Sequence, residues 1–386
     1  MKTVCAFLLA AVALAATEVS TGAILGPAYD QRAFYVRSSP RATWLKTCSG
    51  PEYLPEAAGK LMNLRLAQAL FHDEWMTEQP FDPGANTDAV IAALDFYKRH
   101  GVLMVNVSLQ GGQAGYELKV NGIRRENGYR FGREKGTHVS AFWPDGRLKP
   151  EWLARLERLL HAADRHGMIV NLIYFYQGQD ELFDSTKSIH RAADNVTDWL
   201  IAKNFRNVII DVANEYDIGP RWDFDQYIPQ NIIPLVDEVR ERFQKARFHV
   251  PVTVSSGGRM RYPQSIMGQT DIVLLHGNGR NPQEKARRAG ELSEVARPVL
   301  MNEDDNGRES TLENLKLELA SCDIFFRQAS GWGYMPWAQA QRFPFRYLPG
   351  PEAVVRDDMP EKERDMAYFH AVLDHIAGLV MRKRPD

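Results

Sequence analysis

The sequence predicts an α/β fold, specifically a (β/α)8 TIM barrel, from three observations. The chain has 386 residues, 44% of them hydrophobic, which is enough to bury one large core. Amphipathic helical segments alternate with short apolar segments over most of its length. Two units, around 88–107 and 150–174, repeat one order of helix, basic turn, glycine and apolar strand, which is typical of parallel β/α crossovers. No glycine-rich dinucleotide turn follows the first strand, which disfavours a doubly wound open sheet.

The segment from Pro150 to Gly167 shows this unit most clearly. Proline suits the first helical turn, apolar residues recur at helical spacing, and Gly167 can adopt the left-handed conformation that ends a helix. Residues 168–174 follow as an apolar run expected of a strand buried on both faces. Similar patterns predict helices at 88–100, 192–203, 232–244, 282–295, 311–327 and 361–381, and strands at 42–48, 102–107, 208–212, 250–254, 272–275, 299–301 and 331–337.

Two long connections distinguish the predicted barrel. They cover 50–83 and 111–149, and they follow strands 1 and 2 if residues 42–48 form the first strand. Both would then rise over the C-terminal mouth of the barrel, where active sites are built. We therefore expect one catalytic barrel at 42–386, preceded by an N-terminal segment at 17–41.

The first 16 residues are typical of a signal peptide. Lys2 supplies a positive charge, residues 4–16 are an unbroken apolar run, and residues 13–15 give a small-x-small cleavage site. The run is too short for a comfortable membrane span. We expect a secreted protein, extracellular or periplasmic, with no membrane attachment once the signal is removed.

Charge and cysteine content narrow the function classes. A formal net charge of −2 argues against nucleic acid as the main partner, because phosphate binding needs a basic surface. Outside the signal, Cys48 and Cys322 are expected to be buried and free. No Cys/His cluster suggests a structural metal site, and the expected chemistry needs no metal and no cofactor.

Two glutamates carry the strongest chemical signal. Glu215 and Glu303 each follow an apolar strand, the fourth and the seventh by position, so both would face one mouth of the barrel. A pair of carboxyl groups can cleave a glycosidic bond: one protonates the leaving oxygen, and the other attacks the anomeric carbon or activates water. The sequence therefore favours hydrolysis of a sugar linkage, with an oligo- or polysaccharide as substrate.

These motifs resemble those of the clan A glycoside hydrolases, most closely the cellulase-type enzymes of family five. The resemblance rests on Asn214-Glu215 closing the fourth strand and Glu303 closing the seventh. It implies that Glu303 is the nucleophile, that Glu215 is the acid/base and that Asn214 binds the sugar 2-hydroxyl. It also implies cleavage with retention of anomeric configuration through a glycosyl-enzyme intermediate.

The sequence departs from the family in two places. The clan often has His-x-Tyr at the sixth strand, with the tyrosine steadying the nucleophile, whereas this chain has His276 and then Asn278. The arginine that family five carries near strands one or two has no counterpart in the predicted strands. These departures indicate a divergent branch of the clan.

Further residues at strand ends suit a sugar-binding surface. Sugars combine apolar faces with dense hydroxyls, so aromatic and amide side chains bind them well. We expect substrate contacts from Asn214, His276, Asn278, Gln110, Tyr176 and Trp337, with Gln177 also following the third strand.

Two other functions fit part of the pattern. A non-catalytic carbohydrate-binding barrel is motivated by the missing tyrosine at strand six. A metal-dependent barrel enzyme is motivated by Asp304, Asp305 and His276 near one mouth, because carboxylate and imidazole groups can hold a divalent ion.

Overall fold

A computed structural model describes residues 52–73, 81–111, 139–248, 250–293, 295 and 297–382, together with the backbone of five short strands outside these ranges. The expected signal peptide at 1–16 and Cys48 lie outside the described residues. Cys322 is buried and free, as predicted. Within the part of the chain that is described, no helix combines the length and apolar character needed to cross a bilayer.

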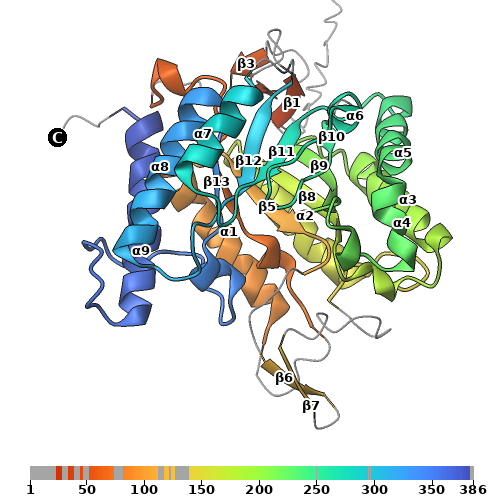
Figure 1. Cartoon of the computed structure of the whole chain (residues 1–386). Helices are drawn as coiled ribbons and strands as arrows, with labels where there is room; N and C mark the ends of the chain where they lie inside the picture. Colours follow the sequence, from red (N-terminus) through yellow and green to blue (C-terminus); the bar gives the residue numbers. More distant parts are fainter. Residues whose placement is uncertain are drawn as a thin grey trace, which may run out of the picture.

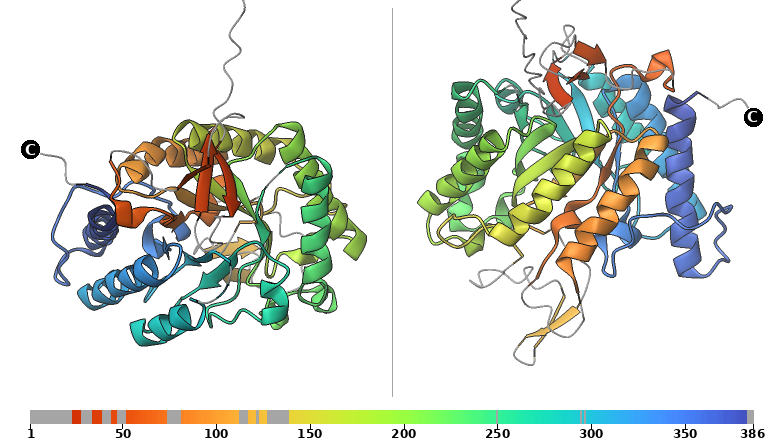
Figure 2. Two further views of the ribbon diagram at one scale, coloured as in Figure 1. Left: turned by 90° about the horizontal axis from the view of Figure 1, so that it is seen from above. Right: turned by 180° about the vertical axis from the view of Figure 1, so that it is seen from behind.

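Eight parallel strands surround one axis, which confirms the predicted TIM-barrel class (Figures 1 and 2). Six of them form one sheet in the order β10-β9-β8-β5-β4-β13, and β11 pairs with β12. Single parallel bridges, Ser255 to Leu274 and Asp304 to Tyr334, join the two sheets at both seams. The strands are β4 (Asn63–Arg65), β5 (Met104–Ser108), β8 (Ile169–Tyr176), β9 (Val208–Asn214), β10 (Val252–Thr253), β11 (Val273–His276), β12 (Val299–Glu303) and β13 (Gly333–Tyr334).

Helices between successive strands form the outer layer (Figure 2). The first, α1, begins at Pro83 and not near residue 88 as predicted, because Asp82 accepts hydrogen bonds from the backbone N–H groups of Gly84 and Ala85 and caps it. The α-helices are α1 (Pro83–Arg99), α2 (Pro150–Arg165), α3 (Thr186–Ala202), α4 (Tyr227–Gln230), α5 (Ile232–Lys245), α6 (Gln264–Met267), α7 (Pro282–Glu291), α8 (Leu312–Gln328) and α9 (Glu361–Val380). Short helices of other types are η1 (Pro55–Ala57), η2 (Ala67–Leu70), η3 (Asp180–Leu182), η4 (Gly219–Arg221), η5 (Phe224–Gln226) and η6 (Trp337–Gln341).

The prediction for the first barrel strand is wrong. Residues Trp44–Lys46 do form a strand, β3, but it belongs to an antiparallel sheet with β1 (Ala23–Pro27) and β2 (Phe34–Ser38). The first barrel strand is β4, which pairs with β5 and β13. The connection at 50–83 therefore contains the first strand and does not follow it.

The two ends of the barrel carry different additions (Figure 1). The antiparallel sheet lies at one end, and the hairpin of β6 (Glu117–Val120) and β7 (Ile123–Glu126) projects from the other. This hairpin belongs to the predicted long connection after the second barrel strand, so it marks the C-terminal mouth.

Asparagines as well as apolar side chains fill the barrel interior. Asn106 donates to Asn63 at 2.7 Å, and Asn171 donates to Asn106 at 2.9 Å, so one polar row crosses β4, β5 and β8. All three side chains are fully buried. Their mutual hydrogen bonds offset the cost of removing amide groups from water.

Candidate active site

Glu215 and Glu303 meet at the C-terminal mouth, as the strand pattern predicts. Glu215 follows β9 directly, and Glu303 is the last residue of β12. One carboxylate oxygen of each and one ring nitrogen of His276 all lie within 4.8 Å of one another. The two glutamates are only 6% and 5% exposed, so their charges interact in a site from which most water is excluded.

Glu303 is surrounded by groups that favour its ionised form. Arg65 Nη2 lies 2.9 Å from its Oε2, and Asn278 Nδ2 donates to its Oε1 at 2.7 Å. Burial alone would raise the pKa of Glu303. Arg65, His276 and the Asn278 hydrogen bond outweigh burial, so the pKa lies below its ordinary value. Glu303 is therefore a carboxylate anion at neutral pH.

Arg65 is one of the residues of this candidate site that the sequence analysis missed. It ends β4, is 1% exposed, and donates from Nη2 to Asn214 Oδ1 at 2.6 Å as well as pairing with Glu303. Burial lowers its pKa, but Glu303 and other nearby anions raise it by more, so it stays charged. Arg65 therefore lies at the end of the first barrel strand, in the region where family five carries an arginine. The available signal was an arginine inside the apolar run Leu61–Leu66, since such a charge needs a buried partner.

Glu215 is held by a chain of amide and guanidinium groups. Gln177 Nε2 donates to its Oε2 at 2.7 Å, and Arg221 Nη1 pairs with the same oxygen at 2.9 Å. Asn214 donates in turn to Gln177 Oε1 at 2.7 Å. Both polar ends of the Asn214 amide are therefore used, one by Arg65 and one by Gln177.

The backbone of Glu215 is strained. Its φ of +51° lies in the left-handed region, which a residue with a Cβ seldom adopts. Its N–H is fixed by Ser255 Oγ at 3.3 Å. Strain of this kind persists only where surrounding contacts over-determine it, and it clusters at functional sites.

His276 lies between the two carboxylates. A register shift after Leu275 sets it opposite Glu303 in the β11–β12 ladder. Its Nδ1 is 3.2 Å from a Glu215 oxygen and 3.6 Å from a Glu303 oxygen, and its Nε2 is buried without a hydrogen-bond partner. Burial lowers its pKa, but both glutamates raise it by more, and the net shift is upward.

Asn278 occupies the place where the clan has tyrosine. Through the 2.7 Å hydrogen bond described above, it supplies a donor to Glu303 as a tyrosine hydroxyl would. The residue at this position differs from that of the clan, but it still donates a hydrogen bond to the Glu303 carboxylate. The tyrosine itself is absent, and a barrel without catalysis stays an alternative hypothesis.

Three other predicted residues lie in different surroundings. The Tyr176 ring centre is 6.0 Å from the Arg65 guanidinium, and burial, followed by Glu303, raises the pKa of its hydroxyl. Trp337 begins η6 and stacks on Arg308, whose Cζ is 4.2 Å from the ring centre. Gln110 is fully buried: its amide donates to the carbonyl of Gln179 and accepts from the N–H of Tyr176. Gln110 thus ties two mouth loops together, and its predicted contact with substrate stays a prediction.

Asp304 points away from the mouth. It is fully buried and pairs with Lys285 at 2.7 Å, and it accepts a hydrogen bond from Trp332 Nε1 at 2.8 Å. Asp305 is 8% exposed, and burial raises its pKa to about 6. The acidic run after Glu303 is therefore not a set of metal ligands around His276.

The cluster of Glu215, His276 and Glu303 has the ligand types of a cation site but the wrong surroundings. Arg65 and Arg221 each lie 2.9 Å from one of these carboxylates. Two guanidinium groups repel an incoming divalent cation and already satisfy the oxygens that would bind it. The charge distribution favours use of the carboxylates themselves.

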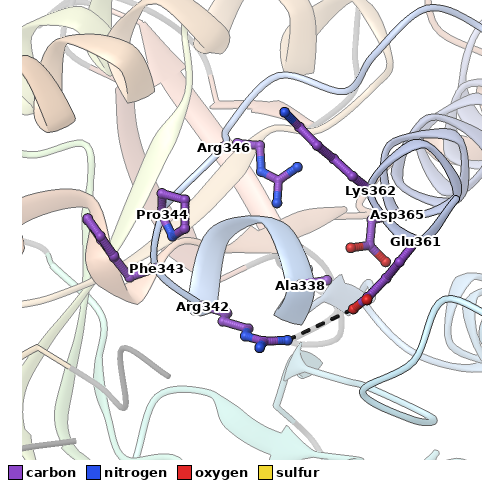
Figure 3. Close-up of a pocket in the computed structure, with 8 residues that line it drawn as sticks. All are labelled: Ala338, Arg342, Phe343, Pro344, Arg346, Glu361, Lys362 and Asp365. Atoms are coloured by element: carbon purple, nitrogen blue, oxygen red, sulfur yellow. Dashed lines mark ion pairs between the residues drawn. The ribbon is translucent and has the colours of Figure 1, made fainter. Parts of the chain in front are cut away.

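A separate pocket of about 370 Å³ lies beside η6, and sequence reasoning did not predict it (Figure 3). It is built from η6, the chain that follows it and the first turn of α9, and it combines three cationic with two acidic side chains. None of the predicted site residues lines it. The lining residues are Ala338, Arg342, Phe343, Pro344, Arg346, Glu361, Lys362 and Asp365.

No protein-family model and no curated protein matches the sequence. Solved structures of glycoside hydrolases are similar in fold. A candidate glycoside hydrolase from Bacteroides vulgatus matches with a TM-score of 0.51 and 12% identity, over 92% of this chain and 61% of that one. A family 5 glycoside hydrolase from the same organism matches with a TM-score of 0.52 and 13% identity, over 90% of this chain and 68% of that one. A broad-specificity endoglucanase from Clostridium longisporum matches with a TM-score of 0.52 and 10% identity, over 83% of this chain and 96% of that one.

These similarities show the fold. At 10–13% identity they leave the chemistry to be argued from the side chains of this chain. The chain spans less than two thirds of the first of these proteins.

Proposed function

We propose that this protein is a secreted retaining glycoside hydrolase that cleaves an O-glycosidic bond in an oligo- or polysaccharide. One observation carries the proposal. Two buried carboxylates lie with oxygens within 4.8 Å at the mouth of a barrel, and one of them is kept ionised by Arg65 and Asn278. Retaining enzymes hold their carboxyl groups about 5–5.5 Å apart and inverting enzymes about 6.5–9.5 Å, so the short spacing supports retention.

In the first step of the proposed mechanism, an oxygen of Glu303 attacks the anomeric carbon. The bond from that carbon to the leaving oxygen breaks, and the leaving oxygen takes the proton carried by Glu215. The product is a sugar esterified to Glu303 and a free hydroxyl on the departing part. Arg65 and Asn278 suit Glu303 to this role because they keep it unprotonated and fix its orientation.

The second step releases the sugar. Glu215, now ionised, takes a proton from a water molecule whose oxygen attacks the same carbon, and the bond to Glu303 breaks. Two inversions at one carbon give net retention. His276, within 3.6 Å of both carboxylates, stabilises the negative charge that moves between them.

Substrate contacts are part of the proposal. Asn214 lies next to Glu215 and would bind the 2-hydroxyl, while Tyr176 and Trp337 would present aromatic faces to the sugar rings. An endoglucanase and family 5 enzymes among the similar folds are consistent with a polysaccharide substrate. Export rests on the signal-like residues 1–16.

The test combines turnover with stereochemistry. The full chain is incubated with a panel of β-glucans, xylans and mannans, and release of reducing ends is followed. Proton NMR of the first product formed should show the substrate's anomeric configuration. Glu303→Ala should lose turnover by several orders of magnitude. Azide should rescue it by occupying the vacated space and giving a glycosyl azide of inverted configuration.

Control variants separate the roles. Glu215→Ala with azide should give a product of retained configuration, because Glu303 still forms the intermediate. Glu309→Gln, an exposed glutamate on the loop after β12, should leave turnover unchanged. Wild-type turnover in Glu303→Ala, or an inverted product from the wild type, would contradict the proposal.

A further inference from the structure

Two histidines and an aspartate converge on the outside of the barrel, far in sequence from the carboxylate pair. His100 follows the last residue of α1, and His370 and Asp374 lie on α9. Residues four apart on a helix share one face, so His370 and Asp374 both point to α1. The first and last helices of the barrel are neighbours because β13 pairs with β4 (Figure 2). One ligand-type atom of each residue lies within 4.8 Å of the other two.

Hydrogen bonds fix the tautomer of both imidazoles. His100 Nδ1 lies 2.8 Å from the carbonyl oxygen of Phe96, and His370 Nδ1 lies 3.0 Å from that of Gly350. A carbonyl oxygen only accepts, so each Nδ1 carries the proton. The Nε2 of each ring faces Asp374 and is the nitrogen left available to a metal ion. A backbone carbonyl bonded to the far nitrogen is the usual support of a metal-binding histidine.

The distances to Asp374 suit a shared ion better than direct hydrogen bonds. Its Oδ1 is 3.5 Å from His100 Nε2 and 3.6 Å from His370 Nε2, both beyond hydrogen-bond range. Ligands 2.0–2.1 Å from a tetrahedral ion are about 3.3–3.4 Å apart.

Two other surface pairs of a histidine and a carboxylate in the described residues are closer. His190 lies 2.5 Å from Glu238, and His375 lies 2.8 Å from Asp323. These two pairs also lie on helices at the protein surface, and their atoms are within hydrogen-bond distance. The wider spacing around Asp374 is therefore not a general property of surface pairs in this chain.

The site is held in place and has one open side. The Phe96 ring centre is 4.1 Å from that of His100 and 5.9 Å from that of His370, so it packs against both imidazoles. The histidine side chains are 17% and 15% exposed, whereas that of Asp374 is 46% exposed. Two imidazoles held by backbone carbonyls, beside a carboxylate with access to water, suit a divalent ion with one exchangeable position.

We propose that His100, His370 and Asp374 bind a divalent transition-metal ion of the Zn²⁺ class. Two neutral imidazoles and one carboxylate suit such an ion, with water as the fourth ligand. The ion would tie the first helix of the barrel to the last. It would stabilise the closed ring and take no part in the proposed hydrolysis.

Calorimetric titration of the full chain with ZnCl₂, in a buffer that does not bind zinc, tests the proposal. Asp374→Asn should weaken binding at this site about 100-fold by removing the charged ligand, and His370→Ala should abolish it. Because Asp374 is half exposed, its replacement by asparagine preserves the fold, which circular dichroism would check. His375→Ala is the matched control, because His375 is the next histidine on the same helix and is not a ligand of the proposed site. We expect it to bind zinc as the wild type does.

Two readouts separate this site from the carboxylate cluster. Zinc should raise the Tm of the wild type and of His375→Ala but not that of His370→Ala, because only a ligand that prefers the folded state stabilises it. Co²⁺ should give the visible absorption bands of a tetrahedral site, and these should disappear in His370→Ala. Zinc affinity, stoichiometry and Tm shift that are the same in His370→Ala and the wild type would overturn the proposal.

Discussion

Arg65 and Glu303 form a 2.9 Å ion pair between side chains that are 1% and 7% exposed. They come from the first and seventh strands of the barrel, which only β13 separates in the ring. Taking two charges out of water is expensive, and a buried pair is seldom a source of net stability. The pair is better explained by what it does to Glu303: it keeps a buried carboxylate ionised and oriented.

Replacing Arg65 should therefore move the pH profile. Arg65→Met removes a cation that lowers the pKa of Glu303, so that pKa should rise. Activity that needs ionised Glu303 is lost as pH falls through its pKa, so the acidic limb of kcat/KM should shift to higher pH. The measurement is kcat/KM against pH for both proteins, with folding checked by circular dichroism. An unmoved acidic limb would mean that Arg65 does not govern the protonation of Glu303.

The hydrogen bond from Asn278 should matter in the same direction and to a smaller extent. Asn278→Ala should lower kcat/KM roughly tenfold to a hundredfold, the usual value of a hydrogen bond to a charged group. Asn278→Asp should be worse and should raise the acidic limb, because it places a second carboxylate beside Glu303. Steady-state kinetics on one soluble oligosaccharide would show both effects, and equal activity of the two variants would contradict this role.

Asp211 should make the protein less stable at neutral pH than in mild acid. It is fully buried on β9, and burial raises its pKa from 3.8 to about 6, despite a hydrogen bond from Ser255 and the nearby cations His276 and Arg65. Since the folded state binds this proton more tightly, its contribution is present below pH 3.8 and lost as pH rises to about 6. Asp211→Asn should therefore be more stable than the wild type above pH 6, by on the order of 2 kcal/mol. Urea unfolding at pH 4 and pH 7.5 would check this, with little difference expected at the lower pH.

Lys285 should be essential to stability although it lies outside the proposed chemistry. Lys285 and Asp304 are both fully buried, so Lys285→Met leaves an unpaired buried carboxylate beside Glu318. The expected loss in free energy of unfolding is about 3–5 kcal/mol. Lys203→Met breaks an exposed pair with Glu157 and should cost less than about 1 kcal/mol. Comparable losses in the two variants would show that burial does not determine the cost.

The sequence predicted those parts of the fold whose residues follow a simple period. The helix at 150–165 and the strand at 169–176 are examples. Apolar residues recur about every 3.6 positions in the helix, which is buried on one face, and they are continuous in the strand, which is buried on both. The first barrel strand was missed because β4 has three residues and two of them, Asn63 and Arg65, are polar groups facing the barrel interior. The Trp44–Lys46 segment is a strand, but its partners in an antiparallel sheet are not visible from its own residues.

The candidate site, like the fold, has a part that the sequence predicted and a part that it did not. The convergence of Glu215 and Glu303 was predictable, because the ends of parallel barrel strands share a mouth. The contacts of Arg65, Asn278 and Arg221 depend on register and rotamers across strands far apart in sequence, which no local pattern specifies. Asp304 was misjudged for this reason: adjacent residues at a strand end point in opposite directions, so its neighbour Glu303 faces the mouth while Asp304 faces the helices.

The pairing of Arg65 with Glu303 also bears on how the chain is made. A ribosome releases the first strand long before the seventh, and more than half of the chain separates the two residues. Until β12 has been synthesised, packing of β4 would bury a cation without its counterion, which is strongly unfavourable. We therefore expect compaction of the N-terminal half to be disfavoured until the last strands are available to complete the ring.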